Sequence, residues 1–182
     1  MAVDLSARQL DDLRAPALVG SLLDRYGTSP VRLCVEVTEP VLMARSPSTD
    51  HTLEAFRALG PRVALEDFGT GYSSLAYVHA LPVTTIKIDR SFIERLGPQD
   101  GSAPMVKAIV EMSHAMGLRV VAEGVNDDRL GARVADLCCE NAQGYYSSKP
   151  LAPGELACWW RTTHSVPDLG ATTSRTDGLP VR

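Results

Sequence analysis

Strand-like and helix-like patterns alternate along the chain six times, and this alternation limits the folds that the chain can adopt. Each expected strand is a short run with many β-branched residues, and the runs are 2–5, 32–38, 62–66, 85–88, 119–123 and 141–145. A helical stretch follows each run, and one of them begins at Ser46-Pro47 and ends at Gly60. Because strands joined by helices pair in parallel, the pattern predicts an α/β protein, either a (β/α) barrel or an open doubly wound sheet.

The polar residues at the strand ends favour the barrel. Side chains alternate along a strand, so Val35 and Val37 share one face while Glu36 lies on the other. Barrel enzymes keep their sites at the carboxyl ends of the strands. The glycine-rich motif of a dinucleotide-binding sheet does not follow the first strand. The polar residues at these ends are Asp4, Glu36, Glu66, Asp67, Lys87, Asp89, Glu123 and Gln143.

A ring of carboxylates predicts bound cations, because the carboxylates would otherwise repel one another. All the candidate ligands are oxygen donors, which favours Mg²⁺ or Mn²⁺ over zinc or copper. Two such ions can hold a phosphate diester and activate a water molecule. Lys87 could then orient that water, act as a base, or stabilise charge on the phosphate. Any one carboxylate at a strand end is more often a helix cap or a surface charge, so the prediction depends on the whole set.

Composition narrows the class of partner and the compartment. Lys and Arg number 18 against 22 Asp and Glu, so the chain has no general basic surface for DNA or for an anionic membrane. No apolar run approaches the ~20 residues of a membrane helix, and no signal peptide opens the chain. The 4 cysteines form no C-x-x-C pair, which argues against a zinc site or a disulfide framework. We therefore expect a cytoplasmic protein with no DNA partner and no membrane segment.

Six motifs together resemble one known family. They occur in order at 4–10, 35–39, 66–75, 86–92, 121–125 and 142–145, and the resemblance extends from about residue 3 to residue 160. The chain is similar in these motifs to the EAL-domain family of bacterial cyclic-di-GMP phosphodiesterases. The resemblance implies a TIM-type (β/α) barrel that hydrolyses cyclic di-GMP to the linear dinucleotide with Mg²⁺ or Mn²⁺.

The resemblance also implies a role for each matching residue. It places metal ligands at Asp4, Glu36, Glu66, Asp67 and Glu123, and catalytic residues at Lys87, Glu123 and Gln143. Asp89 is implied to bind substrate. Glu39 is implied to support the loop 68–74, and in the family this loop region also takes part in a homodimer. A protein partner is a further expectation.

Several positions depart from the family pattern. The Glu-Ala-Leu motif that names the family does not occur before Val3, and with it a metal ligand is missing. Asp4 replaces the usual asparagine, Glu66 replaces the usual aspartate, and Asn126 replaces a glutamate. Glu66 is longer than aspartate by one methylene, and metal sites tolerate little misplacement. We therefore expect weak or no hydrolysis from the chain as given. The alternative is a degenerate EAL module that binds cyclic di-GMP or a protein partner without catalysis.

The number of strands predicts an incomplete barrel. A typical barrel has eight strands and ~250 residues, whereas about six strands are expected here. We therefore expect a partial EAL domain over 1–163, followed by a flexible tail over 164–182. An open barrel exposes two strand edges. Three explanations remain: a true N-terminus upstream of Met1, a partner chain that covers the gap, or a poorly stable chain.

Overall fold

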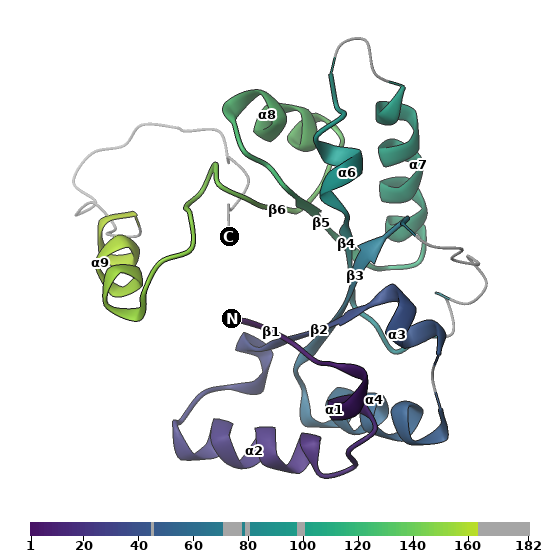
Figure 1. Cartoon of the computed structure of the whole chain (residues 1–182), viewed down its shortest axis with the longest axis vertical. Coiled ribbons are helices and arrows are strands. Elements are labelled where there is room, and N and C mark those ends of the chain that lie inside the picture. The colour runs from purple at the N-terminus through teal and green to yellow at the C-terminus, as the bar shows by residue number, and fades with distance from the viewer. Residues whose placement is uncertain (45, 71–77, 79–80, 98–100, 164–182) are drawn as a thin grey trace.

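Six parallel strands form the centre of the molecule, as the computed structural model in Figure 1 shows. The structure describes residues 1–44, 46–70, 78, 81–97 and 101–163, so the expected tail over 164–182 and most of the loop 68–74 lie outside the described residues. The strands are β1 (Ala2–Asp4), β2 (Cys34–Thr38), β3 (Arg62–Phe68), β4 (Thr85–Ile88), β5 (Arg119–Glu123) and β6 (Asn141–Gln143). They lie in sequence order in the sheet. A doubly wound sheet reverses its strand order, so this order confirms the barrel-type topology.

The helices form two groups along the curved sheet, one beside its first three strands and one beside its last three (Figure 1). Figure 1 shows α1 to α4 gathered beside β1 to β3, and α6 to α8 beside β4 to β6. The helices of the described residues are α1 (Ala7–Leu10), α2 (Ala15–Arg25), α3 (Glu39–Met43), α4 (Pro47–Leu59), α6 (Arg90–Ile93), α7 (Ser102–Ala115), α8 (Asp128–Asp136) and α9 (Pro153–Thr163). The sequence patterns predicted the long helices. They did not predict α1, α3 and α6, because a helix of four or five residues is too short to show a hydrophobic period.

The core lies between the sheet and its helices. Val35, Val37, Ile86 and Ile88 are at most 2% exposed, and Phe56 of α4 is fully buried among them. Burial of each such side chain contributes about 1.5–3 kcal/mol to folding. The apolar residues of the strands therefore face the helices, as their alternation predicted. Consequently the polar residues at the alternate positions face the concave side of the sheet.

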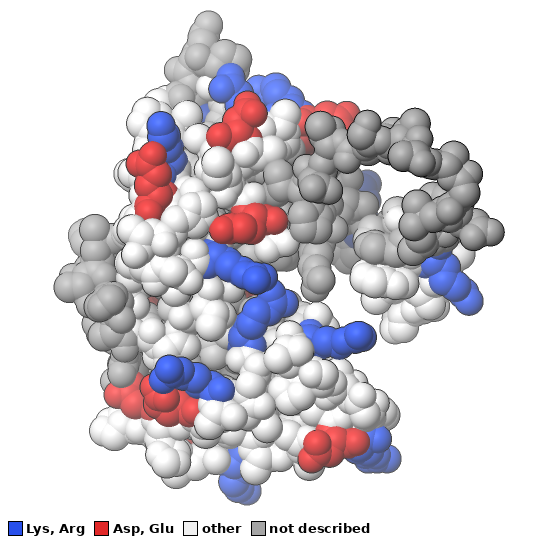
Figure 2. All heavy atoms as spheres, turned by 180° about the vertical axis from the view of Figure 1, so that it is seen from behind, with Lys and Arg blue, Asp and Glu red and all other residues white. Residues whose placement is uncertain are grey.

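Both edges of the sheet are open within the described residues. β1 pairs only with β2, and β6 pairs only with β5. α9 has no buried residue and stands apart from the sheet (Figure 1). Between α9 and the concave face lies a groove of about 1020 Å³, which Arg62 and Arg119 help to line. Figure 2 shows positive side chains beside this hollow. The sheet is thus a partial barrel of six strands, in agreement with the expected incomplete barrel.

Candidate active site

Three carboxylates meet at the carboxyl ends of β1, β2 and β3. Asp4 lies directly opposite Glu36 in the parallel register. Glu66 joins them, and ligand oxygens of the three residues all lie within 4.8 Å of one another. The carboxyl ends of parallel strands meet at one edge of a sheet, which explains why residues so far apart in sequence converge. We refer to Asp4, Glu36 and Glu66 as the first carboxylate group.

A second carboxylate group is formed by Asp67, Asp89 and Glu123, whose ligand oxygens also lie within 4.8 Å of one another. Glu66 and Asp67 are adjacent, and a regular strand would direct them to opposite faces. The register of β3 shifts between Leu65 and Phe68, and Asp67 has a φ of 56°. This left-handed residue breaks the alternation, so both carboxylates reach the same mouth of the sheet. Carboxylate oxygens at this spacing fit a hard cation such as Mg²⁺ or Mn²⁺.

Lys87 of β4 joins the two groups. Its side chain is buried, and its Nζ lies 2.9 Å from Glu36 Oε2 and 2.6 Å from Glu123 Oε1. The same nitrogen contacts Glu66 Oε1. A lone buried ammonium would be costly, and three carboxylates compensate that cost here. The ion pairs therefore hold one residue from each of four strands in a fixed arrangement.

Burial raises the pKa values of three carboxylates in the site. It raises the pKa of Glu36 from 4.5 to about 7, although Lys87 opposes the rise. The pKa values of Glu123 and Asp67 are also raised by burial, and the negative charge of Glu66 adds to both effects. Burial alone would lower the pKa of Lys87, but hydrogen bonds with Glu123 and Glu66 outweigh it and raise that pKa. The lysine therefore keeps its proton, while the carboxylates favour a proton or a cation.

In buffer with a metal chelator, the free energy of unfolding is expected to fall as the pH rises from 5 to 8. The folded protein binds a proton at Glu36 more tightly than the unfolded chain does, because the pKa is about 7 instead of 4.5. The resulting stabilisation is complete below the unfolded pKa and is lost as the pH rises through 7. For Glu36 the loss corresponds to about 3 kcal/mol. Urea unfolding at four pH values measures it. Glu36→Gln should remove most of the decrease, and a flat profile for the unchanged chain would contradict the assignment.

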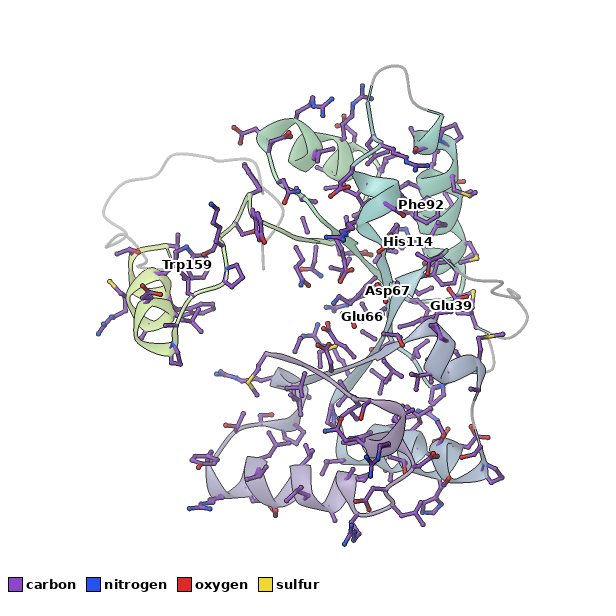
Figure 3. All side chains as sticks on the ribbon, in the orientation of Figure 1. Glu39, Glu66, Asp67, Phe92, His114 and Trp159 are labelled. Atoms are coloured by element: carbon purple, nitrogen blue, oxygen red, sulfur yellow. The ribbon has the colours of Figure 1, made fainter. Side chains whose placement is uncertain are left out.

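Glu39 of α3 contacts the start of the loop that it was predicted to support. Its carboxylate is only 3% exposed and accepts a hydrogen bond of 3.3 Å from the backbone N–H of Gly69. Gly69 has a φ of 99°, and a Cβ at this position would come within 2.8 Å of the Phe92 ring. Figure 3 shows Glu39, Asp67 and Phe92 on one side of the sheet. Residues 71–74 lie outside the described residues, so the role of Glu39 in the rest of the loop stays a prediction.

Two further predicted residues occupy different places in the site. Gln143 lies opposite Glu123 in the register of β6 and lines the groove. Asp89 belongs to the second carboxylate group, and its Oδ1 also accepts a hydrogen bond of 2.9 Å from the backbone N–H of Ser91 at the start of α6. Asp89 is therefore both a helix cap of α6 and a member of the second carboxylate group. Catalytic and substrate-binding roles for these residues remain predictions.

Two glycines support the site, although sequence reasoning gave them no role. Gly124 follows Glu123, has a φ of 73°, and would place a Cβ within 2.5 Å of Arg90 Cβ. Gly144 follows Gln143 and would place a Cβ within 2.1 Å of the Val125 backbone oxygen. The signal that could have identified them is a glycine directly after a polar strand-end residue. Such a position lets the backbone turn away and pack closely behind the site.

Comparison with known proteins points to one family. Residues 1–150 match the EAL domain. MucR of Pseudomonas aeruginosa, described as a bifunctional diguanylate cyclase and cyclic-di-GMP phosphodiesterase, is 36% identical over 156 residues, which is 86% of this chain and 23% of MucR. Curated relatives are therefore much longer, and the chain spans about a fifth of their length.

Solved structures show the same fold. The MucR phosphodiesterase in complex with cyclic di-GMP has a TM-score of 0.78 and 36% identity, covering 85% of this chain and 69% of that one. BlrP1 of Klebsiella pneumoniae, solved with manganese and cyclic di-GMP, has a TM-score of 0.76 and 26% identity, covering 82% of this chain and 38% of that one. Both similarities cover more than four fifths of this chain.

Proposed function

Because the chain belongs to the EAL domain family, we propose that its site binds cyclic di-GMP through divalent metal ions and cleaves it to the linear dinucleotide. The observation that supports this most directly is the pair of carboxylate groups at one mouth of the sheet, joined by the buried Lys87. The relatives described as phosphodiesterases, or solved with manganese and cyclic di-GMP, add to this support. We keep the expectation that turnover by the 182-residue chain itself is weak.

The residues present suit a two-metal mechanism. Asp4, Glu36 and Glu66 would hold one ion and Asp67, Asp89 and Glu123 the other, and the ions would supply charge stabilisation and an activated water. Hydrogen bonds with Glu123 and Glu66 raise the pKa of Lys87, which favours two of its three candidate roles for as long as those contacts persist. An ammonium that keeps its proton can orient a water or stabilise the developing negative charge of the phosphate, but it makes a poor base. Gln143 would supply a further polar contact at the groove.

Hydrolysis is tested by incubating the chain with cyclic di-GMP and Mg²⁺ or Mn²⁺ and separating the products by chromatography. We expect slow, metal-dependent formation of the linear dinucleotide. Glu123→Gln should lower the rate by about 100-fold or more, because the change removes a candidate ligand and a partner of Lys87. Glu54→Gln on the exposed surface of α4 is the matched control and should leave the rate unchanged. No product from a cooperatively folded, metal-loaded chain would contradict the catalytic part of the proposal.

A second candidate function is binding without catalysis. Its support is the first carboxylate group, in which Glu66 contacts Lys87 and Asp4 stands where the family pattern has an asparagine. A degenerate module should bind cyclic di-GMP and release no linear dinucleotide. A protein partner is a related proposal, and the open edges at β1 and β6 support it, because an unpaired edge can accept another strand. A homodimer through the 68–74 region is a further proposal.

The setting of the protein is also a proposal. Within the described residues, no helix combines the length and the hydropathy that crossing a membrane requires. All four cysteines are free, which suits a reducing compartment, and we propose that the protein acts in the cytoplasm. We further propose that residues 1–163 form one partial EAL unit, because the six-stranded sheet extends from Ala2 to Gln143 and α9 follows it in the chain.

A further inference from the structure

Lys87 occupies the position from which a cation would hold both carboxylate groups. Its Nζ contacts Glu36 and Glu66 of the first group and Glu123 of the second. The lysine side chain is fully enclosed, whereas Glu66 and Glu123 each keep 17% of their side chains exposed. The ammonium therefore lies on the inner side of the carboxylates, which leaves their outer side open to solvent. An arriving ion would approach from that outer side.

A divalent ion and the ammonium need overlapping sets of oxygens. At a separation of about 4 Å, each unit charge on the ion would repel the ammonium by about 1 kcal/mol in water and by several times more near a protein surface. The first carboxylate group has three members, and two of them contact Lys87. Ion binding to this group should therefore weaken its contacts with the lysine.

We propose that Lys87 is an internal counter-ion that competes with the divalent ion for Glu36 and Glu66, and that this competition lowers the metal affinity of the site. The inference rests on the proposed function, because it concerns the same carboxylates. The lysine stabilises the fold by compensating buried carboxylates, and a divalent ion has to replace it at the first carboxylate group. Metal binding and the lysine contacts are thus negatively coupled.

Glu66 determines the strength of the competition. It contacts Lys87 directly, and it belongs to the first carboxylate group. Its side chain is longer than that of aspartate by one methylene, and this extra length lets its carboxylate extend to the ammonium. Glu66→Asp keeps the charge and withdraws the carboxylate from Lys87. The shorter side chain should therefore favour the divalent ion over the lysine.

Titration calorimetry with Mn²⁺ alone tests the competition. We expect Lys87→Met to bind Mn²⁺ about tenfold more tightly than the unchanged chain, which lies within the usual range of coupling between linked equilibria. In chelated buffer the same variant should melt at a lower temperature, because the buried carboxylates lose their counter-ion. Lys107→Met, which removes an exposed lysine of α7, is the matched control and should change neither value. Unchanged or weaker Mn²⁺ binding by Lys87→Met would overturn the proposal.

Glu66→Asp covers the case in which Lys87→Met does not fold. It should bind Mn²⁺ more tightly than the unchanged chain, by a smaller factor than Lys87→Met. Glu54→Asp at an exposed pair is its control. Weaker or equal binding by Glu66→Asp, or no Mn²⁺ binding by any folded variant, would overturn the proposal. The measurement uses no nucleotide, so a chain that fails to bind or cleave cyclic di-GMP can still show the competition. Conversely, a chain that binds cyclic di-GMP can lack the competition between Lys87 and the divalent ion.

Discussion

Gly144→Ala is expected to lower the free energy of unfolding by about 3 kcal/mol or more, at the upper end of the cost of overpacking. A Cβ at Gly144 would come within 2.1 Å of the Val125 backbone oxygen and 2.5 Å of the Val125 backbone nitrogen. The obstacle is backbone, so a change of rotamer cannot relieve it. For a chain of this size the melting temperature should fall by about 6–12 °C, measured by circular dichroism.

Gly154→Ala is the matched control for this substitution. Gly154 lies in the first turn of α9, and a Cβ there would meet nothing within 4 Å. Alanine is the better helix former, so the control should be neutral or slightly stabilising. If the two alanine variants melted at the same temperature, the close approach of β6 to the segment after β5 would be wrong.

Glu36→Gln is expected to weaken Mn²⁺ binding by about 100-fold or more. Replacing a residue that only hydrogen-bonds to a metal ligand already lowers metal affinity by about 10–100-fold, and Glu36 is a candidate ligand itself. Glu36 belongs to the first carboxylate group and lies 2.9 Å from Lys87. The raised pKa of about 7 shows that its surroundings disfavour the charged form. At pH 8 in chelated buffer the variant should therefore lose little stability while it loses metal affinity. Calorimetry and urea unfolding of the same samples separate the two effects.

Glu111→Gln is the control for Glu36→Gln. Glu111 lies in an exposed pair with Lys107 on α7, away from the carboxylate groups. Its replacement should leave Mn²⁺ affinity almost unchanged, because solvent and salt screen the charge of an exposed side chain. Equal losses in both variants would mean that net charge, and not the site, controls ion binding.

The sheet and the positions of the strand-end carboxylates were predictable from the sequence. Alternation along a strand is a local property, so Val35, Glu36 and Val37 alone showed which face of β2 would pack against the helices. The expected start of β2 at residue 32 was wrong, because Pro30–Arg32 forms a 3₁₀ turn and the strand begins at Cys34. The expected end of β3 at residue 66 was also wrong, because the strand continues to Phe68 through the left-handed Asp67.

The contacts within the site were less accessible to sequence reasoning. The sequence predicted that the carboxylates would gather at one mouth, but not that they would separate into two groups around Lys87. That division depends on the irregular backbone at Asp67 and on the length of Glu66. The length of Glu66 is visible in the sequence, but the backbone at Asp67 and the contact of Glu66 with Lys87 are settled by long-range packing. The roles of Gly124 and Gly144 depend in the same way on the approach of a distant backbone or side chain.

The central claim is that the carboxylate groups of this chain bind cyclic di-GMP through divalent ions, and titration calorimetry with the nucleotide tests it most directly. In buffer with Mn²⁺ we expect saturable binding of cyclic di-GMP to the unchanged chain. The binding should disappear with a metal chelator and in Glu36→Gln, and it should persist in Glu111→Gln. A cooperatively folded chain that binds Mn²⁺ and yet gives no heat with cyclic di-GMP would contradict the account.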